Sequence, residues 1–163
     1  MVSIVSVNYD QPEVTCEMLE SLRTVTYPNF ETLIVDNASP STSPDIIKQK
    51  YPEVELIISD KNLGFAGGNN IALKQAKGDY ILLLNNDTEV QPDFLDSMVD
   101  LMESDKNIGI VSSKILYFYE DNTIQYAGAS PINPITSRGF HYGYKEKDEG
   151  QFNEVTETSY PHG

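Results

Sequence analysis

The stretch Tyr80-Ile-Leu-Leu-Leu-Asn-Asn-Asp-Thr-Glu-Val90 decides the fold of this chain. Residues 80–84 are apolar or aromatic without alternation, which is typical of a strand buried on both faces of a parallel sheet. The run then changes abruptly to amide, carboxylate and hydroxyl side chains. We therefore expect these polar groups at the carboxyl edge of the sheet, where open α/β sheets bind ligands. The alternative is a polar turn followed by a helix cap, since Asn, Asp and Thr serve that purpose as well.

Strand and helix patterns alternate along most of the chain. Apolar, β-branched runs predict further strands at 2–7, 32–35, 54–58 and 108–111. Apolar residues at helical spacing predict helices at 12–26, 44–50, 69–76 and 92–103. This order predicts an α/β fold with a mostly parallel sheet and helices on both faces. A hairpin is predicted at 115–127, followed by an irregular tail rich in Pro and Gly.

The charge balance excludes nucleic acid as a partner. The chain has 163 residues, the size of one domain, and a net charge of −14 from 25 acidic and 11 basic residues. Its field repels nucleic acid and anionic membrane surfaces. The single cysteine, Cys16, rules out an internal disulfide, and we expect it to be buried. Neither a signal peptide nor a membrane-length apolar run is recognisable, which favours a cytoplasmic location.

Polar side chains follow three of the predicted strands. Asn8 follows the first strand, Asp36 and Asn37 the second, and Asn85, Asn86 and Asp87 the strand quoted above. Because the carboxyl ends of parallel strands share one edge, the three clusters predict a common cleft suited to a nucleotide. An acidic side chain with oxygen-bearing neighbours also suits a hard divalent cation. Turn chemistry at each strand end is the alternative.

A Gly-rich turn, Gly64-Phe-Ala-Gly-Gly68, precedes the helix predicted at 69–76. Glycine allows close approach of the backbone to a ligand, and the N–H groups at a helix N-terminus bind phosphate. The turn matches neither the P-loop nor the dinucleotide pattern, so a tight turn for helix packing is an equal alternative. Asn69 serves equally as a helix cap. The histidines, His141 and His162, form no recognisable constellation with a nucleophile.

Four motifs then follow one another along the chain. They are Val5-Ser-Val-Asn-Tyr9, Leu33-Ile-Val-Asp-Asn-Ala-Ser39, Asn62-Leu-Gly-Phe-Ala-Gly-Gly-Asn-Asn70 and Gly78-Asp-Tyr-Ile-Leu-Leu-Leu-Asn-Asn-Asp-Thr88. In order and spacing they resemble the family 2 glycosyltransferases. The residues of the last two motifs look most like the rhamnosyltransferase-type branch of that family. The resemblance implies a GT-A fold, which is Rossmann-like. It also implies the inverting, metal-assisted transfer of a sugar from a dTDP- or UDP-sugar to a glycan or a lipid-linked saccharide.

The resemblance further implies roles for individual residues. Donor-binding positions would be Asn8, Asp36, Asn62, Gly64, Asn69, Asn85 and Asn86. Asp36 would contact the nucleobase, and Asn8 would line the same pocket. Asp87 would hold a divalent metal, Mg²⁺ or Mn²⁺, that offsets charge on the leaving diphosphate. Asn85 stands where the family's D-x-D motif begins with Asp, and an amide there suits a ribose contact.

One feature of the family has no match here, namely the acidic general base that follows the D-x-D motif. Residues 129–163 contain no such motif, so we expect the general base beyond Gly163 and assign no catalytic residue in this sequence. We therefore expect a donor-binding domain at 1–128, and at 129–163 the start of an acceptor-binding part that continues beyond this sequence.

Such a fragment would bind the donor but transfer sugar poorly or not at all. Membrane association is expected only through regions outside this sequence, at the inner membrane face. A non-catalytic module that binds a nucleotide sugar is the alternative.

Overall fold

The computed structural model describes residues 1–162 and divides into two compact units. The first unit comprises Met1–Asp96 and the second Ser97–His162. The predicted donor-binding range, 1–128, thus covers the first unit and part of the second. The functional boundary at 128 stays a prediction. Gly163 lies outside the described residues, and the general base expected beyond Gly163 stays a prediction as well.

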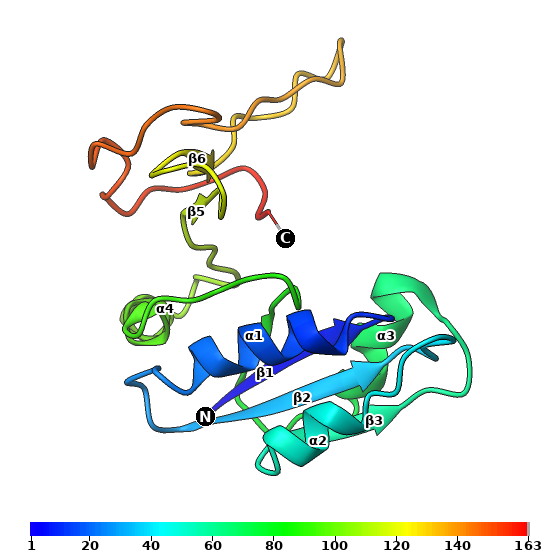
Figure 1. Cartoon of the computed structure of the whole chain (residues 1–163). Helices are drawn as coiled ribbons and strands as arrows, with labels where there is room; N and C mark the ends of the chain where they lie inside the picture. The colour runs from blue at the N-terminus through cyan, green and yellow to red at the C-terminus, as the bar shows by residue number, and fades with distance from the viewer. Residues whose placement is uncertain (163) are drawn as a thin grey trace. The chain divides into compact units, whose positions relative to one another are not determined.

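The first unit is built on a parallel sheet with the strand order β3-β2-β1-β4 (Figure 1). The strands are β1 (Val2–Asn8), β2 (Phe30–Asp36), β3 (Glu55–Ile58) and β4 (Tyr80–Leu83). Every pairing is parallel, and the register sets Asn8 of β1 directly beside Asp36 of β2. The predicted parallel α/β sheet is confirmed. All four strands end on the same edge, which brings their following loops together.

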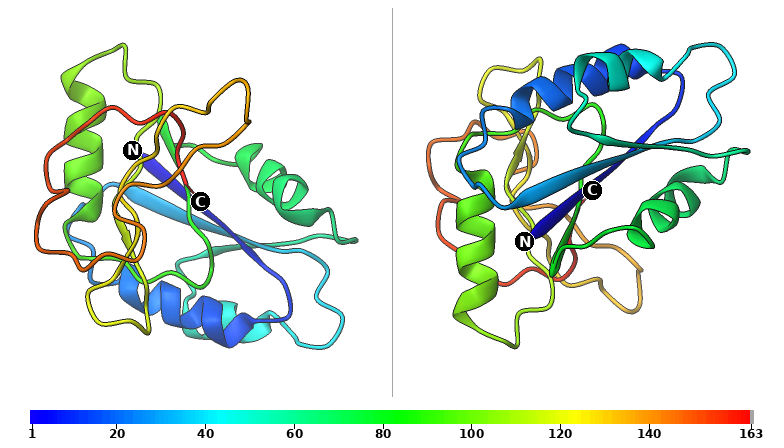
Figure 2. Two further views of the ribbon diagram at one scale, coloured as in Figure 1. Left: turned by 90° about the horizontal axis from the view of Figure 1, so that it is seen from above. Right: turned by 90° about the horizontal axis from the view of Figure 1, so that it is seen from below.

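Helices cover both faces of this sheet, as predicted. Figure 2 shows α1 (Pro12–Leu22) and α2 (Asp45–Lys50) on one face and α3 (Gly64–Leu73) on the other. Under α3 the core consists of fully buried residues, namely Val5, Leu33, Val35 and Ala72. Cys16 of α1 is buried at 5% exposure, as expected, and burial raises the pKa of its thiol.

Two expectations about the elements around β4 are wrong. The helix predicted at 69–76 begins at Gly64 and takes up the Gly-rich turn as its first residues. The strand is not buried on both faces, because Ile81 and Leu83 are 44% and 50% exposed. The physical reason is that only one face of β4 is covered, because the exposed Ile81 and Leu83 alternate with the half-buried Tyr80 and Leu82.

The second unit contains little regular structure. The helix α4 (Phe94–Ser104) crosses the division between the units, and β5 (Ile115–Leu116) pairs with β6 (Ile124–Tyr126) as the predicted antiparallel hairpin. The strand predicted at 108–111 is wrong. Gly109 interrupts that short apolar run, and Ile110 is 72% exposed without a strand partner among residues 1–162. The tail at 129–162 has only isolated bridges, such as Ala129 with His141.

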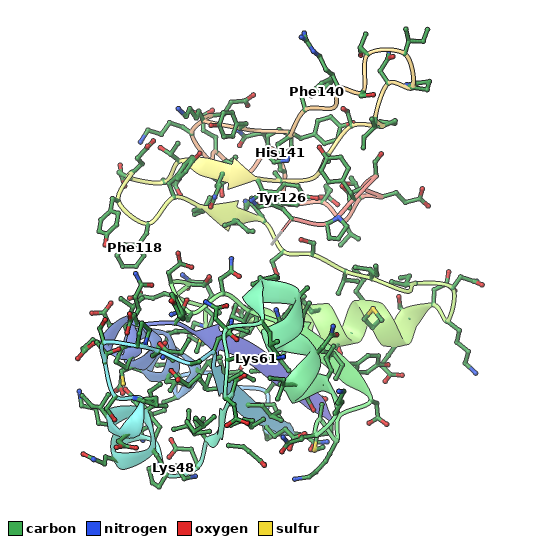
Figure 3. The ribbon with its side chains drawn as sticks, turned by 90° about the vertical axis from the view of Figure 1, so that its right-hand side faces the viewer. Lys48, Lys61, Phe118, Tyr126, Phe140 and His141 are labelled. Carbon is green, nitrogen blue, oxygen red and sulfur yellow. The ribbon has the colours of Figure 1, made fainter. Side chains whose placement is uncertain are left out.

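The small core of the second unit is centred on Tyr126, which is 1% exposed. His141 meets the Tyr126 ring edge-on at a centroid distance of 5.2 Å (Figure 3). His162 stacks against the same ring, also at 5.2 Å. Burial, reinforced by His141, lowers the pKa of His162. These histidines therefore have packing partners, and neither belongs to the sheet edge of the first unit.

Candidate functional site

A pocket of about 260 Å³ lies at the carboxyl edge of the first unit's sheet. It is lined by residues at or after the ends of β1, β2 and β4, in the loop before α3 and at the start of α3, namely Val7, Tyr9, Asn37, Asn62, Gly64, Phe65, Asn85 and Asn86. Amides and aromatic rings therefore make up most of its wall, and no lining residue is a carboxylate or a histidine. Such a surface offers hydrogen bonds in both directions together with flat apolar faces.

Asn37 joins the end of β2 to the start of α3. Its side chain is 3% exposed and forms hydrogen bonds in both directions. The Asn37 Nδ2 donates to Asn62 Oδ1 at 3.0 Å and to the Gly64 carbonyl at 3.2 Å, while the Leu63 N–H donates to Asn37 Oδ1 at 2.9 Å. Asn62 Oδ1 also accepts from the Gly64 N–H at 2.8 Å. Gly64 itself has φ +67°, a conformation that favours glycine. The loop that forms one wall of the pocket is thus held by a single buried amide.

Beside the pocket, Asn8 and Asp36 form a buried pair. Asn8 is 0% and Asp36 2% exposed, and Asn8 Nδ2 donates to Asp36 Oδ1 at 2.7 Å. Ser39 completes the carboxylate's partners, through its hydroxyl at 2.5 Å and its N–H at 3.1 Å. Buried charge is tolerated only with such partners.

Thr15 extends this network to the loop after β4. Its hydroxyl donates to Asn8 Oδ1 at 2.9 Å and accepts from Asn86 Nδ2 at 3.1 Å. Thr15 is fully buried on α1. The ends of β1, β2 and β4 are therefore linked by side chains as well as by sheet register.

Asp10 connects the loop after β1 to the loop after β2. This residue has φ +56°, and its N–H donates to the Ser39 hydroxyl at 2.8 Å. Its carboxylate accepts from the N–H groups of Ser41 and Thr42 at 2.9 and 3.0 Å. The Ser41 N–H, helped by Thr42, lowers the pKa of Asp10.

Asp87 and Asn69 lie apart from the pocket wall. Asp87 is exposed and does not line the pocket. Asn69 is 4% exposed and donates to the Phe65 carbonyl within α3 at 3.0 Å. Among residues 1–162 no three His, Cys, Asp or Glu side chains gather into a metal cluster. Asp87 itself offers carboxylate oxygens, and its sequence neighbours Asn86 and Thr88 carry an amide and a hydroxyl oxygen. Oxygen groups of this kind fit a Mg²⁺-like ion that takes one carboxylate and keeps water and phosphate ligands.

The predicted site residues fall into three groups. Asn62, Gly64, Asn85 and Asn86 line the pocket. Asn8 and Asp36 form the buried pair joined to Asn86 through Thr15. Asn69 and Asp87 lie outside the wall. The role of each residue stays a prediction.

Sequence reasoning missed Tyr9, Thr15, Asn37 and Phe65 as site residues. Asn37 directly follows Asp36, so its place at a strand end was a usable signal. Tyr9 likewise follows Asn8 at the end of β1. Phe65 stands within the Gly-rich turn Gly64–Gly68, which was also a usable signal. Thr15 lies in the predicted helix at 12–26, and its sequence position carried no comparable signal.

The sequence is also similar to known proteins. The model of the family "Glycosyl transferase family 2" matches residues 3–160. The uncharacterised glycosyltransferase YwdF of Bacillus subtilis is 30% identical over 143 residues, which is 86% of this chain and 50% of that protein. The Escherichia coli UDP-Glc:α-D-GlcNAc-diphosphoundecaprenol β-1,3-glucosyltransferase WfaP is 34% identical over 107 residues, 65% of this chain and 43% of that protein. The chain thus spans about half the length of these curated relatives.

A solved structure shares the fold. The mannosyltransferase PcManGT from Pyrobaculum calidifontis, in complex with GDP-Man and Mn²⁺, superposes with a TM-score of 0.63 at 23% identity, covering 71% of this chain and 35% of that one. This likeness and the sheet order confirm the predicted GT-A-like fold. Since the family model spans nearly the whole sequence, the chain belongs to glycosyl transferase family 2.

Proposed function

We propose that this chain binds a nucleoside-diphosphate sugar in the pocket at its sheet edge, as the donor part of a glycosyltransferase. The observation that carries the proposal is the meeting of Asn62, Gly64, Asn85 and Asn86 at one pocket. Asn62 and Gly64 come from one motif of the sequence and Asn85 and Asn86 from another. Their amides match the hydroxyl and carbonyl groups of a nucleotide sugar, which carries many donors and acceptors.

The aromatic side chains support a place for the nucleobase. Tyr9 is 45% and Phe65 56% exposed, although both rings line the pocket. A flat base packs well against such a ring. The base would lie there, within reach of the Asn8–Asp36 pair as the family resemblance implies. The pyrimidine donors dTDP-rhamnose and UDP-glucose are the first candidates. The relative WfaP is named for UDP-Glc.

The diphosphate would lie on the side of the loop after β4. A bound Mg²⁺ or Mn²⁺ neutralises negative charge that develops on the leaving diphosphate. Asp87 is the residue that would hold it, with Asn85 beside it. The solved mannosyltransferase contains Mn²⁺ with its GDP-Man.

The chemical step needs more than this pocket. Inverting transfer needs a base that takes the proton of the acceptor hydroxyl. No pocket-lining residue is a carboxylate or a histidine. We therefore propose that residues 1–163 bind the donor and transfer sugar poorly or not at all, and that the base lies beyond Gly163.

The acceptor of the full enzyme would be a glycan or lipid-linked saccharide, as WfaP's name states for that relative. Such an enzyme would act on the cytoplasmic side of a membrane. Among residues 1–162 no helix has the length and apolarity to cross a bilayer.

Isothermal titration calorimetry tests the proposal. We expect UDP-glucose or dTDP-rhamnose to bind the chain more tightly with Mg²⁺ or Mn²⁺ than with EDTA. GDP-mannose serves as the comparison donor. Absence of binding by all three sugars, with either metal, contradicts donor binding.

A transfer assay separates the enzyme from the alternative, a binding module. If this chain binds the donor without transferring sugar, and a longer chain that continues past Gly163 binds and transfers it, the result supports an enzyme. If both chains bind the donor and neither transfers sugar, the result supports a non-catalytic binding module.

A further inference from the structure

A line of hydrogen bonds runs from the end of β2 to the loop after β4. Asn8 Nδ2 donates to Asp36 Oδ1 at 2.7 Å, and Thr15 Oγ1 donates to Asn8 Oδ1 at 2.9 Å. Asn86 Nδ2 then donates to Thr15 Oγ1 at 3.1 Å. Asn8 and Thr15 are 0% and Asp36 2% exposed. We call this series Asp36–Asn8–Thr15–Asn86 the polar relay.

The direction of each bond in the polar relay follows from Asp36. A carboxylate only accepts, so Asn8 turns its amino group towards Asp36 and its carbonyl oxygen towards Thr15. The Thr15 hydroxyl has one proton, which Asn8 Oδ1 shares with the Gln11 carbonyl at 3.1 Å. A lone pair of Thr15 is therefore left for Asn86. Asn86 meets it with its amino group, so the Asn86 carbonyl oxygen is directed away from the relay.

That carbonyl oxygen belongs to a residue of the pocket wall. Asn86 lines the pocket and is only half-buried. Its Nδ2 is engaged with Thr15, and no hydrogen bond involves its Oδ1 among residues 1–162. The free atom is thus an acceptor, and a hydroxyl group is the ligand chemistry that suits it.

We propose that Thr15 is a positioning residue: through the polar relay it orients the Asn86 carboxamide so that Oδ1 accepts a hydrogen bond from a hydroxyl of the bound nucleotide sugar. This inference rests on the proposed function for its ligand. The orientation of Asn86 itself does not depend on any ligand.

A purely structural role for Thr15 predicts different behaviour. Thr15 also bonds the Gln11 carbonyl one turn earlier in α1, as threonines in helices often do. Thr15→Val keeps the shape of the side chain and removes the hydroxyl, whereas Thr15→Ser keeps the hydroxyl and removes the methyl group. Packing alone would make Thr15→Ser the more harmful change.

Thr24 offers a matched control. Its hydroxyl donates to the Ser21 carbonyl at 2.7 Å, so it makes the same kind of bond to the helix backbone. Thr24 is exposed and lies outside the polar relay. Thr24→Val therefore reports the cost of losing such a bond without any effect on Asn86.

The first experiment is NMR on the chain without ligand. We expect the side-chain amide protons of Asn86 to exchange slowly with water in wild type, in Thr15→Ser and in Thr24→Val. In Thr15→Val they exchange faster and their resonances shift. Unchanged Asn86 resonances and exchange in a folded Thr15→Val chain overturn the relay.

The second experiment is calorimetry with UDP-glucose, dTDP-rhamnose and GDP-mannose, each with Mg²⁺. We expect Thr15→Val to weaken the tightest of these complexes about five- to tenfold, the worth of one hydrogen bond, and Thr15→Ser to stay within about twofold. In an Asn86→Ala background Thr15→Val should add no further loss, because Thr15 acts through Asn86. If Thr15→Val lowers nucleotide-sugar affinity equally in wild type and in the Asn86→Ala background, Thr15 does not act through Asn86.

The two proposals fail in different ways. If wild type binds none of the three nucleotide sugars, the proposed function fails, and the NMR experiment still decides the polar relay. If wild type binds and Thr15→Val binds equally well, the proposed function stands and the positioning role is wrong.

Discussion

At the scale of the residue, Asp36 is the last residue of β2 and Asp87 follows β4, and the two carboxylates have opposite surroundings. Asp36 is 2% exposed and accepts three hydrogen bonds, from Asn8 and from the hydroxyl and N–H of Ser39. Asp87 is exposed. Strand-end position, which the sequence reveals, therefore predicts where a carboxylate lies along the sheet. It does not predict whether neighbouring side chains bury the group.

Asp87→Ala tests the metal ligand. Because Asp87 is exposed, the free energy of unfolding should change by less than about 0.5 kcal/mol. Nucleotide-sugar affinity in Mg²⁺ should fall to the value that wild type shows in EDTA. Calorimetry with and without metal measures this, and Glu89→Ala, also at an exposed position, is the control. If the metal still strengthens nucleotide-sugar binding in Asp87→Ala, Asp87 is not the metal ligand.

Asp36→Ala tests the buried pair. The change leaves Asn8 and Ser39 without their acceptor, so we expect a loss of about 2–4 kcal/mol in the free energy of unfolding, measured in urea. If the variant remains folded, the ratio of its affinities for UDP- and GDP-sugars should also move closer to one. An unchanged preference argues against a contact between Asp36 and the base.

At the scale of the element, the strongest sequence patterns predicted the structure best. The β-branched run at 2–7 became β1, and the polar residues after β1, β2 and β4 met at one edge. The run at 108–111 failed because Gly109 and the exposed Ile110 have no pairing partner in the described chain, and pairing is a long-range property. Thr15 was missed for the same reason, since its importance comes from Asn86, a partner distant in sequence.

Gly78 should be required for the start of β4. A Cβ added at Gly78 would lie 2.5 Å from the Ser3 nitrogen and 2.8 Å from the Tyr80 carbonyl oxygen. Since both obstacles are backbone, we expect Gly78→Ala to lower the free energy of unfolding by about 1–3 kcal/mol.

Gly109→Ala is the matched control for this change, because a Cβ there meets nothing within 4 Å. It should alter stability by less than about 0.5 kcal/mol in the same urea unfolding experiment. Equal stability of the two variants would mean that the backbone beside Gly78 yields easily.

Glu31 should make the junction of β2 with β1 and β4 sensitive to acid. Burial raises the pKa of Glu31, but hydrogen bonds from the Ser3 hydroxyl and the Lys77 N–H outweigh it, and the net pKa is lowered. A lowered carboxyl pKa stabilises the fold above the ordinary value of 4.5, and this contribution is lost as the pH falls through the folded-state pKa.

Glu31→Gln keeps an acceptor at this position and removes the charge. The variant should therefore be less stable than wild type near pH 7, and the difference should narrow as the pH falls below about 4.5. Urea unfolding between pH 3 and 7 measures it. A difference that is constant with pH contradicts the charged role of Glu31.

At the scale of the whole molecule, the chain carries a net charge of −14. A diphosphate in the proposed site would therefore have to be held by neutral amides, backbone N–H groups and a bound cation. The chain also spans only about half the length of the relatives YwdF and WfaP. Sequence motifs were sufficient for the family and the fold, because several had to occur in order.

The most direct test of the central claim is a crystal structure of the chain with Mn²⁺ and UDP-glucose or dTDP-rhamnose. We expect nucleotide density in the pocket between Asn62, Phe65 and Asn86, and an anomalous manganese peak at coordinating distance from Asp87. Nucleotide bound at another surface, with this pocket empty, would contradict that claim.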